Sequence, residues 1–275
     1  MHTSPTAAPL QRRVQSRIDN ADAYGFFNLL TGPELLDEVE SLLPEHRERL
    51  FPPTETLSMF MAQALSADSN CQRAVDDAAV KRLIGGLPRC SSNTAAYCKA
   101  RARLPQTMVS TLARHTGELV AGEVSDGWLW RGRRVLLTDG TTLSLVDTED
   151  NQAAYPQPNS QREGLGFPKM RLLGLLCLAS GALLDAAEGP CEGKGSDEQT
   201  LFLGLLDNLA AGDVLLGDAY FPTYFLLCEL LRRGVDGLFE QYGARKRSTD
   251  FRCGKRLGPK NHLIVWTKPK AAAAC

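Results

Sequence analysis

Two aspartates stand inside segments whose other residues favour buried β-strands. Asp139 lies in the middle of residues 133–146, RRVLLTDGTTLSLV, and Asp218 lies near the end of residues 213–220, DVLLGDAY. A buried strand does not hold a carboxylate by default, and Asp139 with Gly140 predicts a bulge or bend that lifts the acid to the sheet surface. Carboxylate oxygens are the ligands that Mg²⁺ and Mn²⁺ prefer. The two aspartates therefore predict a divalent-metal site, although either one alone is more often a turn or cap residue.

The elements around these aspartates predict a mixed sheet with flanking helices, an α+β or α/β fold. We expect strands at 136–146, 168–179, 182–188, 213–220 and 235–241, a helix at 196–209 that opens with a capping box from Ser196 to Gln199, and a helix at 222–233. This order, β-β-β-α-β-α-β, resembles the RNase H-like layout, in which the first and fourth strands are neighbours. Such neighbours would bring Asp139 and Asp218 within reach of one metal.

The part of the chain before the sheet has a helical pattern. Residues 1–20 predict a disordered lead-in, and residues 21–124 predict a helical bundle with helices at 33–44, 54–65 and 71–84 and two more starting at 94 and 105. Helix-turn-helix readers of DNA are built from such pieces. Lys99, Arg101 and Arg103 are therefore candidate phosphate contacts, and a solvated helix face explains them equally well.

Positive charge gathers near the end of the chain although the formal net charge is only −1. Beyond a predicted RNase H-like core at 133–241, residues 242–275 form a basic segment, which predicts contact with a nucleic-acid backbone. A solvated tail is the alternative. The cations of this segment face Asp250 alone, nine against one, and they are Arg245, Lys246, Arg247, Arg252, Lys255, Arg256, Lys260, Lys268 and Lys270.

The cysteines and the apolar segments bear on where the protein is found. The eight cysteines include no C-x-x-C pair, and several lie in apolar runs, so we expect reduced thiols and a cytoplasmic location. The longest uncharged apolar run, 172–184, is too short to span a bilayer, so no membrane partner is expected. His115 and His262 lack partners at ligand spacing. The remaining acids near the expected site are interpreted as loop and surface charges: Asp147, Glu149, Asp150, Asp185, Glu188, Glu192 and Glu240.

Several short motifs resemble those of DDE transposases of the bacterial insertion-sequence-four family. They are LTDGT at 137–141, GK at 193–194, GDVLLGDAYF at 212–221 and, more loosely, SNTAAYCKAR at 92–101. The resemblance implies that Asp139 and Asp218 are catalytic and bind Mg²⁺ or Mn²⁺. It also implies a double-stranded DNA partner, the terminal inverted repeats of a mobile element, cut and joined by a homodimer in a synaptic complex. Two metals about 3.5 to 4 Å apart would activate the nucleophile and stabilise the leaving oxygen.

The third acid of that family, a glutamate on a helix beyond the last strand, has no counterpart in this sequence. Tyr242 and Arg245 have the spacing of the family motif, but its glutamate position falls on Thr249. The basic end resembles a truncated or frame-shifted terminus, and Glu240 is the nearest substitute acid. Three functions stay open: a transposase, a DNA-binding remnant that does not cleave, and an RNase H-like nuclease whose third carboxylate comes from elsewhere in the chain. The missing glutamate favours the second for this chain, so we expect a catalytically incomplete transposase that binds DNA without cleaving it.

Overall fold

A computed structural model describes residues 32–43, 51–162, 164–193, 195–240, 254–259 and 261–268. The expected lead-in at 1–20 and most of the basic segment, including Arg245, Lys246, Arg247 and Arg252, lie outside these residues. The chain forms two compact units, Met1–His115 and Thr116–Cys275. The division falls within one long helix rather than in a linker between helix and sheet.

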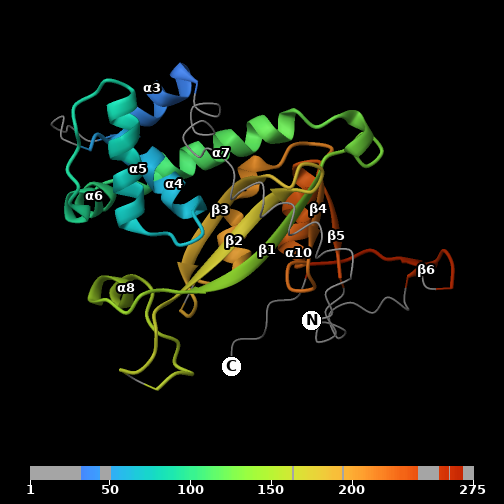
Figure 1. The fold of residues 1–275 in the computed structure, drawn as a ribbon. Coiled ribbons are helices and arrows are strands. Elements are labelled where there is room, and N and C mark those ends of the chain that lie inside the picture. Colours follow the sequence, from blue (N-terminus) through green and yellow to red (C-terminus); the bar gives the residue numbers. More distant parts are fainter. Residues whose placement is uncertain are drawn as a thin grey trace, which may run out of the picture. The chain divides into compact units, whose positions relative to one another are not determined.

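The first unit is helical, and its helices begin and end within a few residues of the sequence expectations (Figure 1). Asparagines begin two of them: the side chain of Asn70 accepts the backbone N–H groups of Gln72 and Arg73, and that of Asn93 accepts the N–H of Ala95. These side chains satisfy N–H groups that have no partner within the helix. The helices are α3 (Pro33–Ser41), α4 (Pro53–Leu65), α5 (Cys71–Ile84), α6 (Thr94–Arg101) and α7 (Gln106–Gly122), the last crossing into the second unit.

The second unit contains a five-stranded mixed sheet in the order β3-β2-β1-β4-β5 (Figure 1). Strand β2 pairs antiparallel with β1 and β3, whereas β4 pairs parallel with β1 and β5. The expected neighbours, β1 and β4, are therefore hydrogen-bonded side by side. The strands are β1 (Val135–Ser144), β2 (Lys169–Cys177), β3 (Leu183–Pro190), β4 (Val214–Gly217) and β5 (Asp236–Phe239).

One face of this sheet is buried along β2, the first half of β1 and β4. Alternating side chains of β1, β2 and β4, such as Leu136, Leu175 and Leu215, have no exposed surface. They pack with residues from helix α9 (Glu198–Leu203), the 3-10 turn η2 (Leu206–Asn208) and helix α10 (Tyr224–Arg232) in one apolar cluster. Burial of this apolar surface holds α9 and α10 in place, and α9 is the helix that matters for the site below.

Two local expectations are wrong. Strand β1 pairs with β2 without interruption through Asp139 and Gly140, so there is no bulge at the aspartate. The capping box also does not form: Asp197 is the N-cap of α9 and accepts the N–H of Thr200, while the Ser196 hydroxyl donates to the carbonyl of Gly193. The Asp197 carboxylate caps the helix in place of the Ser196 hydroxyl. Its two oxygens accept the backbone N–H and the side-chain hydroxyl of Thr200, and a charged acceptor forms stronger hydrogen bonds than a hydroxyl does.

Three elements were not expected. The 3-10 turn η1 (Asp126–Trp128) precedes strand β1, and helix α8 (Glu149–Ala154) follows that strand. Inside the basic segment, β6 (Lys255–Arg256) pairs with β7 (His262–Leu263) in a two-stranded ribbon. Within the described residues, no helix has both the length and the apolar character needed to cross a membrane.

Arg134 and Asp213, which directly precede β1 and β4, form a partly buried ion pair that should contribute strongly to stability. Asp213 is 4% exposed, and its two oxygens lie 3.0 and 2.6 Å from Nε and NH2 of Arg134. The second oxygen also accepts the backbone N–H of Ala210 at 2.8 Å. Asp213→Ala would leave the Arg134 guanidinium without its carboxylate partner. We therefore expect the free energy of unfolding, measured in urea, to fall by about 3 kcal/mol. Asp207→Ala, which removes an exposed acid, should change it by less than about 0.5 kcal/mol.

Candidate functional site

The parallel pairing of β1 with β4 places Asp139, in the middle of β1, near Asp218, which directly follows the last residue of β4. The paired residues run up to Leu137 opposite Leu216, two residues before each aspartate. Both aspartates are exposed. Asp139 Oδ1 accepts the backbone N–H of Gly140 at 2.9 Å, and Asp218 Oδ1 accepts that of Tyr220 at 2.8 Å. The Asp139 carboxylate is thus held within strand β1 and the Asp218 carboxylate within the turn after β4, and both keep oxygen lone pairs available for another ligand.

A third carboxylate, that of Glu198, approaches from helix α9. A Cβ atom placed on Gly140 would lie only 2.5 Å from Oε1 of Glu198, so the glutamate carboxylate rests against the strand residue next to Asp139. Helix α9 is tied to the turn after β4, because Gln199 Nε2 donates to the carbonyl of Tyr220 at 2.5 Å. The turn that carries Asp218 and the helix that carries Glu198 are therefore fixed relative to each other.

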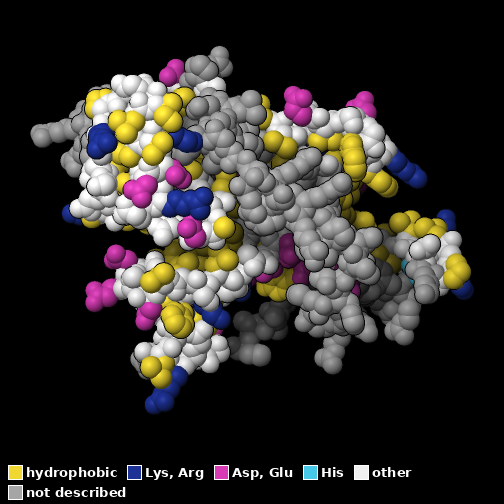
Figure 2. All heavy atoms as spheres, viewed as in Figure 1, with side chains coloured by type: hydrophobic (Ala, Val, Ile, Leu, Met, Phe, Trp, Pro, Cys, Tyr) yellow, Lys and Arg dark blue, Asp and Glu magenta, His cyan; other side chains and the backbone are white. Residues whose placement is uncertain are grey.

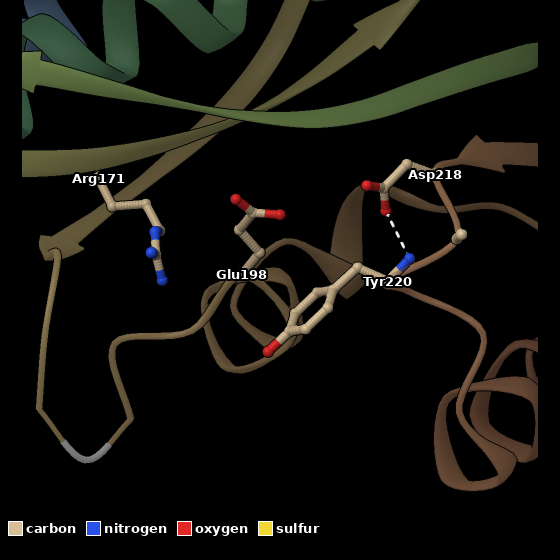
Figure 3. Close-up of a pocket in the computed structure, with 5 residues that line it drawn as sticks. Arg171, Glu198, Asp218 and Tyr220 are labelled. Atoms are coloured by element: carbon tan, nitrogen blue, oxygen red, sulfur yellow. Dashed lines mark hydrogen bonds between the residues drawn. The ribbon is translucent and has the colours of Figure 1, made fainter. Parts of the chain in front are cut away.

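Glu198 and Asp218 line one pocket of about 410 Å³ together with Arg171, Ala219 and Tyr220. In Figure 3 the Glu198 carboxylate lies between the Arg171 guanidinium and Asp218. Arg171 NH1 donates to the carbonyl of Ser196 at 2.7 Å, which links strand β2 to the segment just before α9. The pocket thus has two acids and one guanidinium, each anchored by its own hydrogen bond or helix.

Charge couples the three carboxylates. Burial raises the pKa of the Glu198 carboxyl, the nearby Arg171 guanidinium opposes this, and the negative charges of Asp218 and Asp139 raise the pKa further. Like charges raise a carboxyl pKa only when they lie close enough to repel. The concentration of negative charge beside the middle of β1 and the end of β4 favours a bound cation.

The donor set fits a hard divalent cation in its chemistry. All three acids offer oxygen, and Mg²⁺ is usually bound through one or two carboxylates, with water and substrate phosphate completing its octahedron. Glu198 and Asp218 meet that need within one pocket. Asp139 does not line the pocket, because neighbouring strand residues face opposite ways and Gly140 is the one that faces Glu198. Accordingly, no group of three His, Cys, Asp or Glu side chains within the described residues could hold a metal ion.

The sequence did not single out Glu198. An acid in the first turn of a helix is ordinary, because the helix dipole favours it there. The proposed substitute acid, Glu240, follows β5 and is exposed, and it does not line the pocket that the described residues form. The only signal available was indirect: Glu198 stands in the first helical turn after the hairpin, and the expected order of elements puts this helix against β1.

The expected phosphate-binding residues of α6 and the turn that follows it differ from one another in the structure. Lys99 and Arg103 are exposed, but Arg101 is partly buried and its guanidinium lies 5.5 and 5.8 Å from the ring centres of Phe60 and Tyr97. Arg101 NH1 also donates to Gln63 Oε1 at 3.1 Å. Arg101 therefore supports the packing of the first unit, while its two neighbours face solvent.

Two cations of the basic segment lie on a described two-stranded ribbon. Lys255 and Arg256 are exposed on the β6–β7 ribbon. On the face in view, Figure 2 shows Lys and Arg side chains dispersed among Asp and Glu rather than gathered in one patch.

Comparisons with known proteins do not assign a function to this site. No protein-family model matches the chain, and a search of curated proteins returns no match. The chemistry of the pocket is therefore the basis for assigning a function.

Replacing Gly140 offers a test of how Glu198 is positioned. In Gly140→Ala the new Cβ would meet the Glu198 carboxylate, the far end of a flexible side chain that can turn away. We expect a small stability change, below about 1 kcal/mol, together with at least about tenfold weaker Mn²⁺ binding. Urea unfolding and a Mn²⁺ titration measure the two effects. Gly127→Ala, where a new Cβ meets no atom, is the matched control, and equal Mn²⁺ binding by both variants would contradict the prediction.

Proposed function

We propose that this chain is a DNA transposase of the DDE kind with an RNase H-like core, and that it breaks and joins phosphodiester bonds with Mg²⁺ or Mn²⁺. The observation that carries the proposal is the pocket shared by Glu198 and Asp218, beside Asp139 on the adjacent parallel strand. Asp218 and Glu198 would hold the cation, and Asp139 would add negative charge from the adjacent strand. A cation held there supplies Lewis-acid stabilisation of the scissile phosphate and of the attacking oxygen.

The chain's own residues suggest how a phosphate would be placed. Arg171 lies in the same pocket as the two acids, and a guanidinium can donate two parallel hydrogen bonds to phosphate oxygens. Its hydrogen bond to Ser196 uses NH1 and holds the side chain in the pocket. A phosphate between Arg171 and the carboxylate-bound cation would be neutralised from both sides, which is the requirement for attack on an anionic phosphodiester.

Glu198 bears on the choice among the three functions open from the sequence. The Glu198 carboxylate is a third acid close to the two aspartates. It favours a protein that cleaves DNA over a remnant that only binds DNA. It equally favours the related candidate, an RNase H-like nuclease, because that function requires an acid supplied from elsewhere in the chain. The two differ in outcome: a transposase joins a cut end to a second duplex, whereas a nuclease leaves the cut ends unjoined.

The test is an assay of supercoiled duplex DNA incubated with the full chain and Mn²⁺. We expect nicked circles that form with Mn²⁺ or Mg²⁺ and disappear when the metal is chelated. A second duplex that carries candidate element ends detects joining. Salt-dependent binding without nicking in either metal would overturn the cleaving function and leave the DNA-binding remnant.

DNA binding itself should depend on salt through the exposed cations. Replacing Lys99 and Arg103 together by alanine should flatten the slope of log affinity against log salt concentration by about 2, because each lost phosphate contact releases about one counterion fewer. Arg101→Ala should instead destabilise the first unit, since Arg101 packs on Phe60 and Tyr97. A mobility-shift series at several salt concentrations measures the slope. An unchanged slope in the double variant would remove α6 from the DNA-binding surface.

A further inference from the structure

Two cysteines of the first unit lie side by side within a network of hydrogen-bond donors. Cys71 is the first residue of α5 and Cys98 lies in α6, and their sulfur atoms are 4.0 Å apart. Both side chains are partly exposed, so a small oxidant can reach them. The two helices belong to one packed core, which contains Val75 and Ala78 of α5 and Tyr97 and Ala100 of α6. The backbone therefore already holds the two thiols together.

The surroundings of Cys71 differ from those of Cys98. Gln63 Nε2 donates to Cys71 Sγ at 3.2 Å, and both the Cys98 thiol and Arg101 NH1 lie 4.0 Å from the same sulfur as donors. The Gln63 amide cannot turn easily, because its Oε1 accepts from Tyr97 Oη at 2.8 Å and from Arg101 at 3.1 Å. Donors that converge on one sulfur stabilise negative charge there, which is the property of an attacking thiolate.

We propose that Cys71 and Cys98 form a redox-active pair that a hydroperoxide converts to a disulfide, with Cys71 as the sulfur oxidised first. Burial raises the pKa of the Cys98 thiol and its hydrogen bond to Cys71 raises it further, which suits Cys98 to act as the second, resolving sulfur of the pair. This pair is separate from the carboxylate pocket, and the proposal does not depend on the function proposed above.

The reaction balances with one hydroperoxide for each disulfide. The Cys71 thiol loses its proton, its sulfur attacks the terminal peroxide oxygen, and the O–O bond breaks, which gives a Cys71 sulfenic acid. The alkoxide or hydroxide leaves and takes up the proton that the thiol lost, as an alcohol or water. The Cys98 sulfur then attacks the Cys71 sulfur, and the hydroxyl leaves as water with the Cys98 proton. The sulfurs must close from 4.0 Å to a bond of about 2.05 Å, which rotation about the side-chain torsions can supply.

The experiment treats the reduced full chain with hydrogen peroxide, blocks the remaining thiols with N-ethylmaleimide and maps the disulfides by mass spectrometry. We expect a peptide pair joined through Cys71 and Cys98 as the main product, reversed by dithiothreitol. In Cys98→Ser, dimedone should trap the sulfenic acid on Cys71. In Cys71→Ser, modification of Cys98 should be at least about tenfold slower.

Cys90→Ser is the matched control, because Cys90 also packs against the Tyr97 cluster and is partly buried. It should form the Cys71–Cys98 link at the wild-type rate, with an unchanged far-UV circular dichroism spectrum. Links from Cys71 or Cys98 to other cysteines in comparable yield, or no link at all, would overturn the proposal. A dimedone label on Cys98 rather than Cys71 in the wild-type chain would overturn the assignment of the attacking sulfur.

Discussion

Replacing either pocket acid by its amide, Glu198→Gln or Asp218→Asn, should lower the rate of Mn²⁺-dependent DNA nicking at least about 100-fold. Cation stabilisation of the reacting phosphate supplies several kcal/mol, and a neutral amide removes one charged ligand. The amides keep the size of the side chains, so Tyr220 can still donate to residue 218 and α9 can still fold. A plasmid-nicking time course at saturating DNA measures the effect.

Two exposed acids of the same unit serve as controls for these variants. Glu149 lies in the first turn of α8 and the Asp207 side chain is 93% exposed, and neither lines the pocket. Glu149→Gln and Asp207→Asn should nick DNA at the wild-type rate. If they lose as much activity as the pocket variants, loss of net charge rather than loss of a cation ligand explains the effect.

Phe202→Ala should destabilise the second unit by about 3 to 5 kcal/mol, the usual cost of a cavity left by a buried aromatic ring. Phe202 has no exposed surface, and its ring packs edge-on against Phe221 with centres 5.8 Å apart. Both residues belong to the cluster that covers the buried sheet face. Urea unfolding followed by circular dichroism measures the change.

The neighbouring Leu203 gives the matched control for this prediction. It lies on the same short helix but is 58% exposed, so Leu203→Ala should change the unfolding free energy by less than about 0.5 kcal/mol. Comparable losses in both variants would mean that α9 is held by its own turns and not by the sheet. Because Phe202 and Glu198 share one helix, Phe202→Ala should also weaken Mn²⁺ binding.

The elements of the sheet were predictable because their residues have unambiguous local signals. Strands β1 and β4 are apolar runs bounded by charged or glycine-containing segments, and α5 runs from Cys71 to Ile84 as expected, with Gly85 at its end. Helix α9 was expected to continue to Leu209 but ends at Leu203, with Gly204 as its C-cap. Its later leucines, Leu205, Leu206 and Leu209, are buried all the same, because a 3-10 turn presents them to the core.

The site was predictable only in part, since residues far apart in sequence make it. Asp139 and Asp218 could be paired because the order of strands predicts their adjacency, which the parallel ladder of β1 and β4 confirms. Glu198 could not be chosen over other first-turn acids by its type or spacing. Its contact with Gly140 arises from the packing of α9 on the buried face, which depends on Phe202 and the leucines rather than on Glu198 itself.

Manganese binding, followed by electron paramagnetic resonance, tests most directly whether these carboxylates form a cation site. The wild-type chain should bind Mn²⁺, and Asp139→Asn, Asp218→Asn and Glu198→Gln should each weaken the affinity, the last two by at least about tenfold because they remove ligands from one pocket. Asp207→Asn should bind Mn²⁺ as tightly as the wild type. Equal affinity in all five proteins would show that the acids beside the middle of β1 and the end of β4 do not hold a metal and would contradict the proposed function.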